Sequence, residues 1–213
     1  RRYSLMKKTK RSKKSRSWVI KQHRDQFYKK SKTLGYRSRS AFKLLELNQK
    51  FKFIMKKTNL LDIGSSPGGW AQVASKIINT GKILGIDLKS METLKNVKFF
   101  KCDFQENDTK IKILEFFPNK VDVVISDMAA NTTGNKNLDC IRTNLLTLDV
   151  IYFSKTVLKK KGIVVSKLFM GEDFITVKNE AKKLFKSVHF FKPESSRNES
   201  KETYIHCKEL KTL

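Results

Sequence analysis

The chain has 213 residues, 39% of them hydrophobic, which suits a globular domain and excludes a wholly disordered chain. Its net charge of +26, from 46 Lys and Arg against 20 Asp and Glu, indicates a polyanionic partner. It contains no run of about 18 apolar residues, so we expect no membrane-spanning helix and no membrane partner.

The positive charge is concentrated at the N-terminus, where residues 1–43 hold 17 Lys and Arg against the single acid Asp25. We expect residues 1–16 to form a flexible basic arm. Its stretch KKTKRSKKSRS has no apolar face, so it favours nucleic acid over a membrane surface. Charge does not separate RNA from DNA. The same charge opposes self-association, so we expect a monomer.

Two basic helices are predicted next. The first spans about 17–32, with Trp18, Phe27 and Tyr28 among its apolar contacts, and Gly35 ends it. The second spans about 38–51 and carries apolar residues at helical spacing. Their aromatic residues either stack on bases or pack on the protein. We assign these helices (about 17–53) as an N-terminal extension of one domain that covers residues 17–213.

From residue 59 onward, short apolar runs alternate with helical stretches. The predicted strands are Leu60–Ile63, Ile83–Ile86, Val97–Phe100, Val121–Ser126, Ile163–Leu168, Val188–Phe191 and Tyr204–Cys207. The predicted helices are Gly69–Ile78, Asp108–Phe117, Leu138–Leu158 and Phe174–Leu184. This alternation predicts an α/β fold with a seven-stranded, mostly parallel sheet covered on both faces. The short connection 192–201 predicts an antiparallel pair at one edge.

A glycine-rich loop in the segment LLDIGSSPGGWAQVA follows the first of these strands. The loop after the first strand of an open α/β sheet forms a ligand crevice. Asp87 ends the next strand, 23 residues after Gly64, where an acid can hold the ribose hydroxyls of a nucleoside. A purely structural turn is the alternative. The spacing is GxxxG rather than GxGxxG and includes Pro67, which disfavours a dinucleotide and favours a nucleoside without phosphates, such as S-adenosylmethionine.

The cysteines and histidines indicate no metal site. Cys102, Cys140 and Cys207 lie far apart and show no zinc-ligand spacing, as expected of free thiols in a reducing compartment. The three histidines are scattered, and we interpret them as structural or RNA-facing. We therefore expect a cytoplasmic protein. A mitochondrion or another organelle is the alternative, because the basic, acid-poor start also suits the remnant of a transit peptide.

Several ordered motifs resemble one family. They are YRSRSAFKLLE, DIGSSPGGW, SDMAANTTG, VVSKLFMGE and KPESSRNESKETY, and the similarity runs from about residue 15 to 207. Together they resemble the FtsJ family of ribosomal RNA large-subunit 2′-O-methyltransferases. The resemblance implies a Rossmann-like, S-adenosylmethionine-dependent methyltransferase fold with N-terminal basic helices. It also implies methylation of a uridine ribose in large-subunit ribosomal RNA.

The resemblance also implies site residues. The family's catalytic tetrad of two lysines and two acids falls on Lys43, Asp127, Lys167 and Glu202. Its cofactor contacts fall on Gly68, Trp70, Asp87, Asp103 and Asp127, so that Asp127 borders both ligands. Two departures, Ser65-Ser66 in place of small alanines and Ala130 in place of a frequent proline, concern loop geometry and remove no charged group.

The tetrad suits the chemistry, because a ribose hydroxyl must be positioned and must lose its proton during methyl transfer. We hypothesise that Lys167 takes this proton, that Lys43 and Glu202 orient Lys167, and that Asp127 holds it. Taken singly, each residue has an ordinary structural interpretation. Asp127, for example, can cap a turn, and Glu202 can be a protective charge on an edge strand. The joint match favours the catalytic interpretation.

Three alternatives remain open at this stage. Relatives with the same tetrad methylate transfer RNA or messenger RNA caps, and no additional cap-base pocket is evident in the sequence. A non-catalytic RNA-binding or ribosome-assembly factor would keep the fold without the reaction, although the complete tetrad argues against it. A nicotinamide-dependent reductase would need the phosphate-binding fingerprint that the glycine loop lacks.

Overall fold

The computed structural model describes residues 25–212, so the predicted arm (1–16) and the first half of the predicted helix 17–32 lie outside the described residues. The strands are β1 (Leu60–Ile63), β2 (Ile83–Asp87), β3 (Val97–Lys101), β4 (Val121–Ser126), β5 (Leu158–Phe169), β6 (Phe185–Phe191) and β7 (Glu202–Leu210). The helices are α2 (Gln26–Thr33), α3 (Ser40–Phe51), α4 (Gly69–Ile77), α5 (Asn107–Phe116), α6 (Lys136–Val157) and α7 (Phe174–Leu184).

The strands form one sheet in the order β3-β2-β1-β4-β5-β7-β6. The first five strands along the chain pair in parallel, whereas β7 runs antiparallel to both β5 and β6. The prediction of a seven-stranded, mostly parallel sheet with an antiparallel edge is therefore confirmed. The last strand is not itself the edge, because β7 is inserted between β5 and β6. Glu202, at its start, is accordingly not an edge-strand charge.

Strand β5 differs most from its prediction, since it begins at Leu158 rather than Ile163. Leu158 pairs with Val121, and the register shifts before the regular pairing resumes at Val123 and Ile163. The intervening Lys159–Lys161 are not part of an apolar run, so hydrophobic patterning did not reveal this part of the strand.

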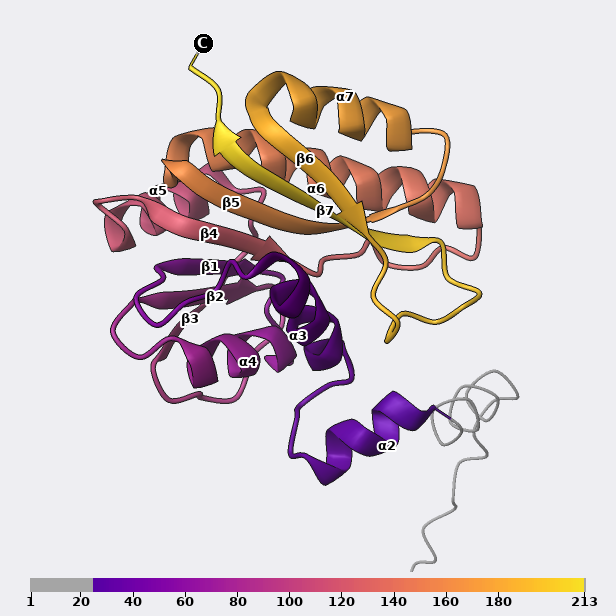
Figure 1. Cartoon of the computed structure of the whole chain (residues 1–213), viewed down its shortest axis with the longest axis horizontal. Coiled ribbons are helices and arrows are strands. Elements are labelled where there is room, and N and C mark those ends of the chain that lie inside the picture. The colour runs from indigo at the N-terminus through magenta and orange to yellow at the C-terminus, as the bar shows by residue number, and fades with distance from the viewer. Residues whose placement is uncertain (1–24, 213) are drawn as a thin grey trace, which may run out of the picture.

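Helices cover both faces of the sheet, as Figure 1 shows. Alternate residues of the parallel strands enter two different cores, because successive side chains of a strand point to opposite faces. In β4, Val124 packs in the core beneath α5, α6 and α7, whereas its neighbours Val123 and Ile125 pack in the core beneath α3 and α4. This two-sided burial explains why the strand sequences are almost continuously apolar.

The N-terminal extension is attached to the sheet mainly through α3. Its residues Ala41, Leu44 and Leu47 are fully buried in the core that also contains β1 and α4. Helix α2, capped by the Asp25 carboxylate, lies beyond α3 and away from the sheet (Figure 1). Phe27 packs on the ring of Phe42 at 5.6 Å between centroids. Packing on the protein is thus the observed role of this aromatic residue.

Within residues 25–212, no helix combines the length and the apolar character needed to cross a membrane.

A buried histidine lies between β7 and the end of α3. The His206 ring stacks on Phe51 with 4.2 Å between centroids, and neither ring nitrogen has a hydrogen-bond partner among the described residues. Burial, assisted by the neighbouring His189, lowers the pKa of His206 to about 4. The folded protein therefore holds this imidazole neutral at pH values where the unfolded chain protonates it.

We predict that His206 makes the free energy of unfolding fall as the pH falls from about 6.5 to 4. In this range the unfolded state binds a proton at His206 that the folded state does not bind. The free energy of unfolding therefore falls by roughly 2–3 kcal/mol over the range. Denaturant unfolding of wild type and His206→Phe at pH 4.5, 5.5 and 7 tests this. The wild type should lose stability relative to the variant at the lower pH values. A pH-independent difference between the two proteins would contradict the prediction.

The comparison with a variant is needed because Asp62 acts in the opposite direction. Burial raises the pKa of Asp62 to about 7, so this group contributes most to stability at low pH and its contribution declines as the pH rises toward 7. The stability of the wild type alone reports the sum of the two effects.

Candidate active site

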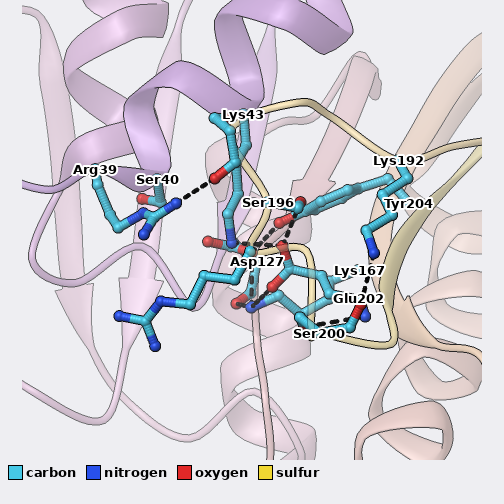
Figure 2. Close-up of polar contacts among 12 residues, drawn as sticks. Arg39, Ser40, Lys43, Asp127, Lys167, Lys192, Ser196, Ser200, Glu202 and Tyr204 are labelled. Carbon is cyan, nitrogen blue, oxygen red and sulfur yellow. Dashed lines mark hydrogen bonds and ion pairs between the residues drawn. The ribbon is translucent and has the colours of Figure 1, made fainter. Parts of the chain in front are cut away.

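The four residues of the predicted tetrad lie together on the face of the sheet that α3 covers (Figure 2). They come from four separate elements. Lys43 lies on α3, Asp127 follows β4 directly, Lys167 lies near the end of β5, and Glu202 begins β7. The structure therefore brings together side chains that are up to 159 residues apart in the sequence.

The tetrad forms a continuous chain of ion pairs. Lys43 Nζ lies 2.6 Å from Glu202 Oε1, and Lys167 Nζ lies 2.8 Å from Asp127 Oδ1. A longer contact of 3.7 Å between Lys167 Nζ and Glu202 Oε2 joins the two pairs. Lys167 Nζ also donates to the backbone carbonyl of Asp127 at 2.9 Å. The exposed fraction of these side chains is only 9–17%, so each charge is both largely desolvated and paired.

Strand register explains how β5 and β7 contribute to one cluster. In the antiparallel pair, Lys167 lies opposite Tyr204 and Phe169 opposite Glu202. Because side chains alternate along a strand, Lys167, Glu202 and Tyr204 all stand on the same face. Because β7 is inserted next to β5, the Glu202 carboxylate lies close to Lys167.

The electrostatic balance at Lys167 favours its charged form. Burial alone would lower its pKa, but the carboxylates of Asp127 and Glu202 outweigh burial, and the pKa lies above its ordinary value. Burial would likewise raise the pKa of Asp127, and the ammonium groups of Lys167 and Lys43 lower it instead. In the folded protein the cluster therefore contains an ammonium at Lys167 and a carboxylate at Asp127.

Tyr204 also belongs to this cluster, although it is not a member of the predicted tetrad. Its hydroxyl donates to Asp127 Oδ1 at 2.7 Å, and its ring is completely buried. Burial, together with Asp127 and Glu202, raises the pKa of Tyr204 well above its ordinary value, so the hydroxyl stays protonated. Glu202 lies two residues before the predicted strand Tyr204–Cys207. The observed strand begins at Glu202, which places both side chains on one face.

A cavity of about 530 Å³ adjoins the cluster. It lies at the carboxyl ends of β1, β2 and β4, where the strand order changes direction and open α/β sheets bind ligands. Three predicted residues, Asp87, Asp103 and Asp127, line its wall. Asp127 is therefore shared between the cavity and the tetrad.

The glycine loop shapes one wall of this cavity. Gly64 has φ = 79°, in the left-handed region, and a Cβ atom there would overlap the side chain of Met128. The next loop is tied to this one by Asp87, whose carboxylate accepts hydrogen bonds from the backbone N–H groups of Ser66 at 2.9 Å and Lys89 at 2.8 Å. Asp87 thus holds two loops while it faces the cavity.

Gly68 and Trp70 are placed differently from the three aspartates. Neither is part of the cavity wall. The Trp70 indole is buried, and its Nε1–H donates to the carbonyl of Ser40 at 2.8 Å. A Cβ on Gly68 would come within 2.8 Å of the Arg37 guanidinium. Both residues lie instead where the start of α4 packs against the N-terminal extension.

Over residues 25–212, no group of three or more His, Cys, Asp or Glu side chains is arranged to hold a metal ion.

Comparison with known proteins agrees with this geometry. The family model described as FtsJ-like methyltransferase matches residues 36–210. Ribosomal RNA large subunit methyltransferase E of Pelagibacter ubique is 46% identical over 197 residues, covering 92% of this chain and 97% of the relative.

Solved structures give the same result. A Plasmodium falciparum protein assigned as a ribosomal RNA methyltransferase is 33% identical, with a TM-score of 0.73, and the match covers 82% of this chain and 98% of that chain. Human methyltransferase-like protein 13 in complex with SAH is 13% identical, with a TM-score of 0.55 over 79% of this chain and 78% of that chain, and shares the fold. The extent and identity of these matches show that the chain belongs to the FtsJ-like methyltransferase family.

Proposed function

We propose that this protein transfers a methyl group from S-adenosylmethionine to a ribose 2′-hydroxyl of large-subunit ribosomal RNA, with a uridine as the target. The observation that carries the proposal is the position of Asp127, which lines the cavity and also pairs with Lys167. A cofactor in the cavity and a ribose at the tetrad would then meet at this residue. The relative named ribosomal RNA large subunit methyltransferase E supports this choice of substrate.

The walls of the cavity suit a sulfonium nucleoside. Asp87 and Asp103 provide carboxylates for ribose hydroxyls and for base or amino N–H groups, and Asp127 provides negative charge for a cationic centre. The wall also includes the cations Lys89 and Arg142, so its three carboxylates leave a small net negative charge, which favours a cationic nucleoside over a pyrophosphate. When bound, the cofactor supplies a methyl group that its sulfonium already activates.

The residues of the tetrad would position the ribose and move its proton. The neutral form of Lys167 is the proposed proton acceptor for the 2′-hydroxyl. Because Asp127 and Glu202 hold the pKa of Lys167 above its ordinary value, that neutral form is scarce at neutral pH. Lys43 would balance the charge of Glu202, with which it pairs at 2.6 Å. The Tyr204 hydroxyl would fix the orientation of the Asp127 carboxylate.

The N-terminal extension is the proposed RNA-binding element. Residues 1–43 carry 17 Lys and Arg, and Lys43 brings this basic segment directly to the tetrad. We also propose that the extension and the sheet form one domain, because Leu44 and Leu47 share a core with β1. The protein would act as a monomer, in the compartment where its ribosomes are assembled.

The first prediction of this proposal concerns substrate and catalytic residue together. Label from methyl-labelled S-adenosylmethionine should enter large ribosomal subunits or their RNA, prepared without the native modification, as 2′-O-methylribose. Lys167→Ala should lower turnover by about 10²–10⁴-fold with cofactor affinity intact. Lys155→Ala, an exposed residue at the far end of α6, serves as the matched control.

Other outcomes of this experiment separate the alternatives. Label in transfer RNA alone would replace the proposed substrate and keep the chemistry. Cofactor binding without transfer to any RNA would favour an assembly factor. Full turnover by Lys167→Ala would exclude Lys167 as the proton acceptor.

The second prediction concerns pH. Since Asp127 and Glu202 raise the pKa of Lys167 above its ordinary value, the fraction of neutral lysine grows about tenfold per pH unit throughout the neutral range. Single-turnover rates at saturating cofactor and RNA should therefore rise between pH 6 and 9. Lys167→Arg, which stays charged throughout, should abolish the rise. A flat wild-type profile would show that the proton goes to a different group.

The third prediction concerns the cofactor. Asp87→Asn should weaken binding of S-adenosylmethionine by about 10- to 100-fold, because a charged hydrogen-bond acceptor in the cavity wall is lost. Isothermal titration in the absence of RNA measures this directly. Asp108→Asn, on the exposed first turn of α5, should bind as the wild type does. Equal affinity in both variants would remove Asp87 from the proposed site.

A further inference from the structure

The connection between β6 and β7, residues 192–201, packs against a single stripe of α3. Arg39, Lys43 and Glu46 follow the i, i+4, i+7 spacing that places side chains on one side of a helix. All three contact this connection or the strand that follows it. Lys43 is the tetrad member of the stripe, and the other two residues lie outside the tetrad.

Glu46 and Arg39 hold the backbone of the connection. The two carboxylate oxygens of Glu46 accept hydrogen bonds from consecutive backbone N–H groups, those of Glu194 at 2.6 Å and Ser195 at 3.1 Å. The Arg39 guanidinium donates to the carbonyl of Ser195 and also pairs with Asp25. Hydrogen bonds from a charged acceptor are stronger than neutral ones, so this segment is fixed relative to α3.

The next residue, Ser196, reaches the tetrad. Its side chain is buried, and its hydroxyl donates to Glu202 Oε1 at 2.8 Å (Figure 2). The same oxygen lies 2.6 Å from Lys43 Nζ, which leaves the second oxygen, Oε2, toward Lys167 at 3.7 Å. Two donors from different elements thus hold Oε1 and determine which way Oε2 points.

These contacts form a relay from α3 to Lys167. Glu46 sets the backbone of Ser195, the adjacent Ser196 sets the Glu202 carboxylate, and Glu202 faces the amine of Lys167. Reacting groups depend steeply on such alignment, since a misplacement of about 1 Å can cost about 10²-fold in rate. A stabilising contact without this role would change only the free energy of unfolding.

We propose that Glu46 and Ser196 are positioning residues for methyl transfer, and that both act through the orientation of the Glu202 carboxylate. The inference rests on the proposed function, in which Glu202 orients Lys167. It adds two residues outside the tetrad, on α3 and on the β6–β7 connection, to the machinery of this active site.

The test is a double-mutant cycle in the full-length protein. Ser196→Ala and Glu46→Gln are each made in the wild type and in Glu202→Gln. Single-turnover methyl transfer to undermodified large-subunit RNA, cofactor affinity and melting temperature are measured for all of them. Ser187→Ala on β6 and Glu115→Gln on α5 are the matched controls, because the structure places neither in the site.

In the wild-type background, each substitution should lower the transfer rate by about 10- to 100-fold. Cofactor affinity should stay within about twofold of the wild type, because neither residue lines the cavity. In the Glu202→Gln background, neither substitution should lower the rate further, since residues that act through a shared partner are not additive. The controls should transfer at the wild-type rate.

Two results would overturn the inference. One is a wild-type transfer rate in both single variants. The other is a loss of rate that is fully additive with the loss in Glu202→Gln, which would show a role independent of that carboxylate. The two single variants keep the test meaningful if one of them fails to fold. The proposed function fails in a different way, namely if the wild type transfers no label, and the inference then falls with it. A full rate in Glu202→Gln would leave the proposed function standing and would overturn the inference alone.

Discussion

Two lysines and two carboxylates buried together form the constraint on which the rest of this structure depends. An unpaired charge with the exposure of Lys167, only 9%, would cost several kcal/mol, so its two partners must arrive with it when the chain folds. Those partners come from β4 and β7. The sheet order that inserts β7 beside β5 therefore does more than pack the core. It also supplies a carboxylate that compensates for the burial of the Lys167 charge.

The same constraint connects the two halves of the site. Asp127 follows β4 at the point where the strand order reverses, and its carboxylate contacts both Lys167 and Tyr204 while it lines the cavity. A change in the charge or orientation of Asp127 would therefore alter both the cavity and the ion pair with Lys167. This shared position gives a physical reason why cofactor and acceptor would be aligned by one residue rather than by two separately placed groups.

The N-terminal extension is more than a basic attachment. Through Leu44 and Leu47, α3 completes the core on one face of the sheet, and the neighbouring stripe of the same helix supplies Lys43 and holds the β6–β7 connection. An element that binds RNA phosphates would in this way be rigidly joined to the reacting groups. That arrangement favours precise presentation of a ribose, because reactivity depends on how well the acceptor is aligned.

The sequence by itself determined the elements and the candidate residues. Apolar runs gave β1 and β4 with their observed bounds. The ordered motifs pointed to the four side chains that the structure brings into one cluster, and to Asp87 and Asp103 in the cavity wall. These features are local, because a strand pattern and a sequence motif each depend on residues that follow one another in the chain.

Only the tertiary structure decided what depends on distant segments. It placed β7 inside the sheet, Trp70 in the core instead of the cavity wall, and Tyr204 and Ser196 against the tetrad. It also decided the charge of Lys167, where burial and two carboxylates act in opposite directions and the carboxylates prevail. Strand pairing and pKa values both depend on neighbours that come from distant parts of the chain. Those neighbours are brought together only when the chain folds, so the local sequence pattern does not reveal them.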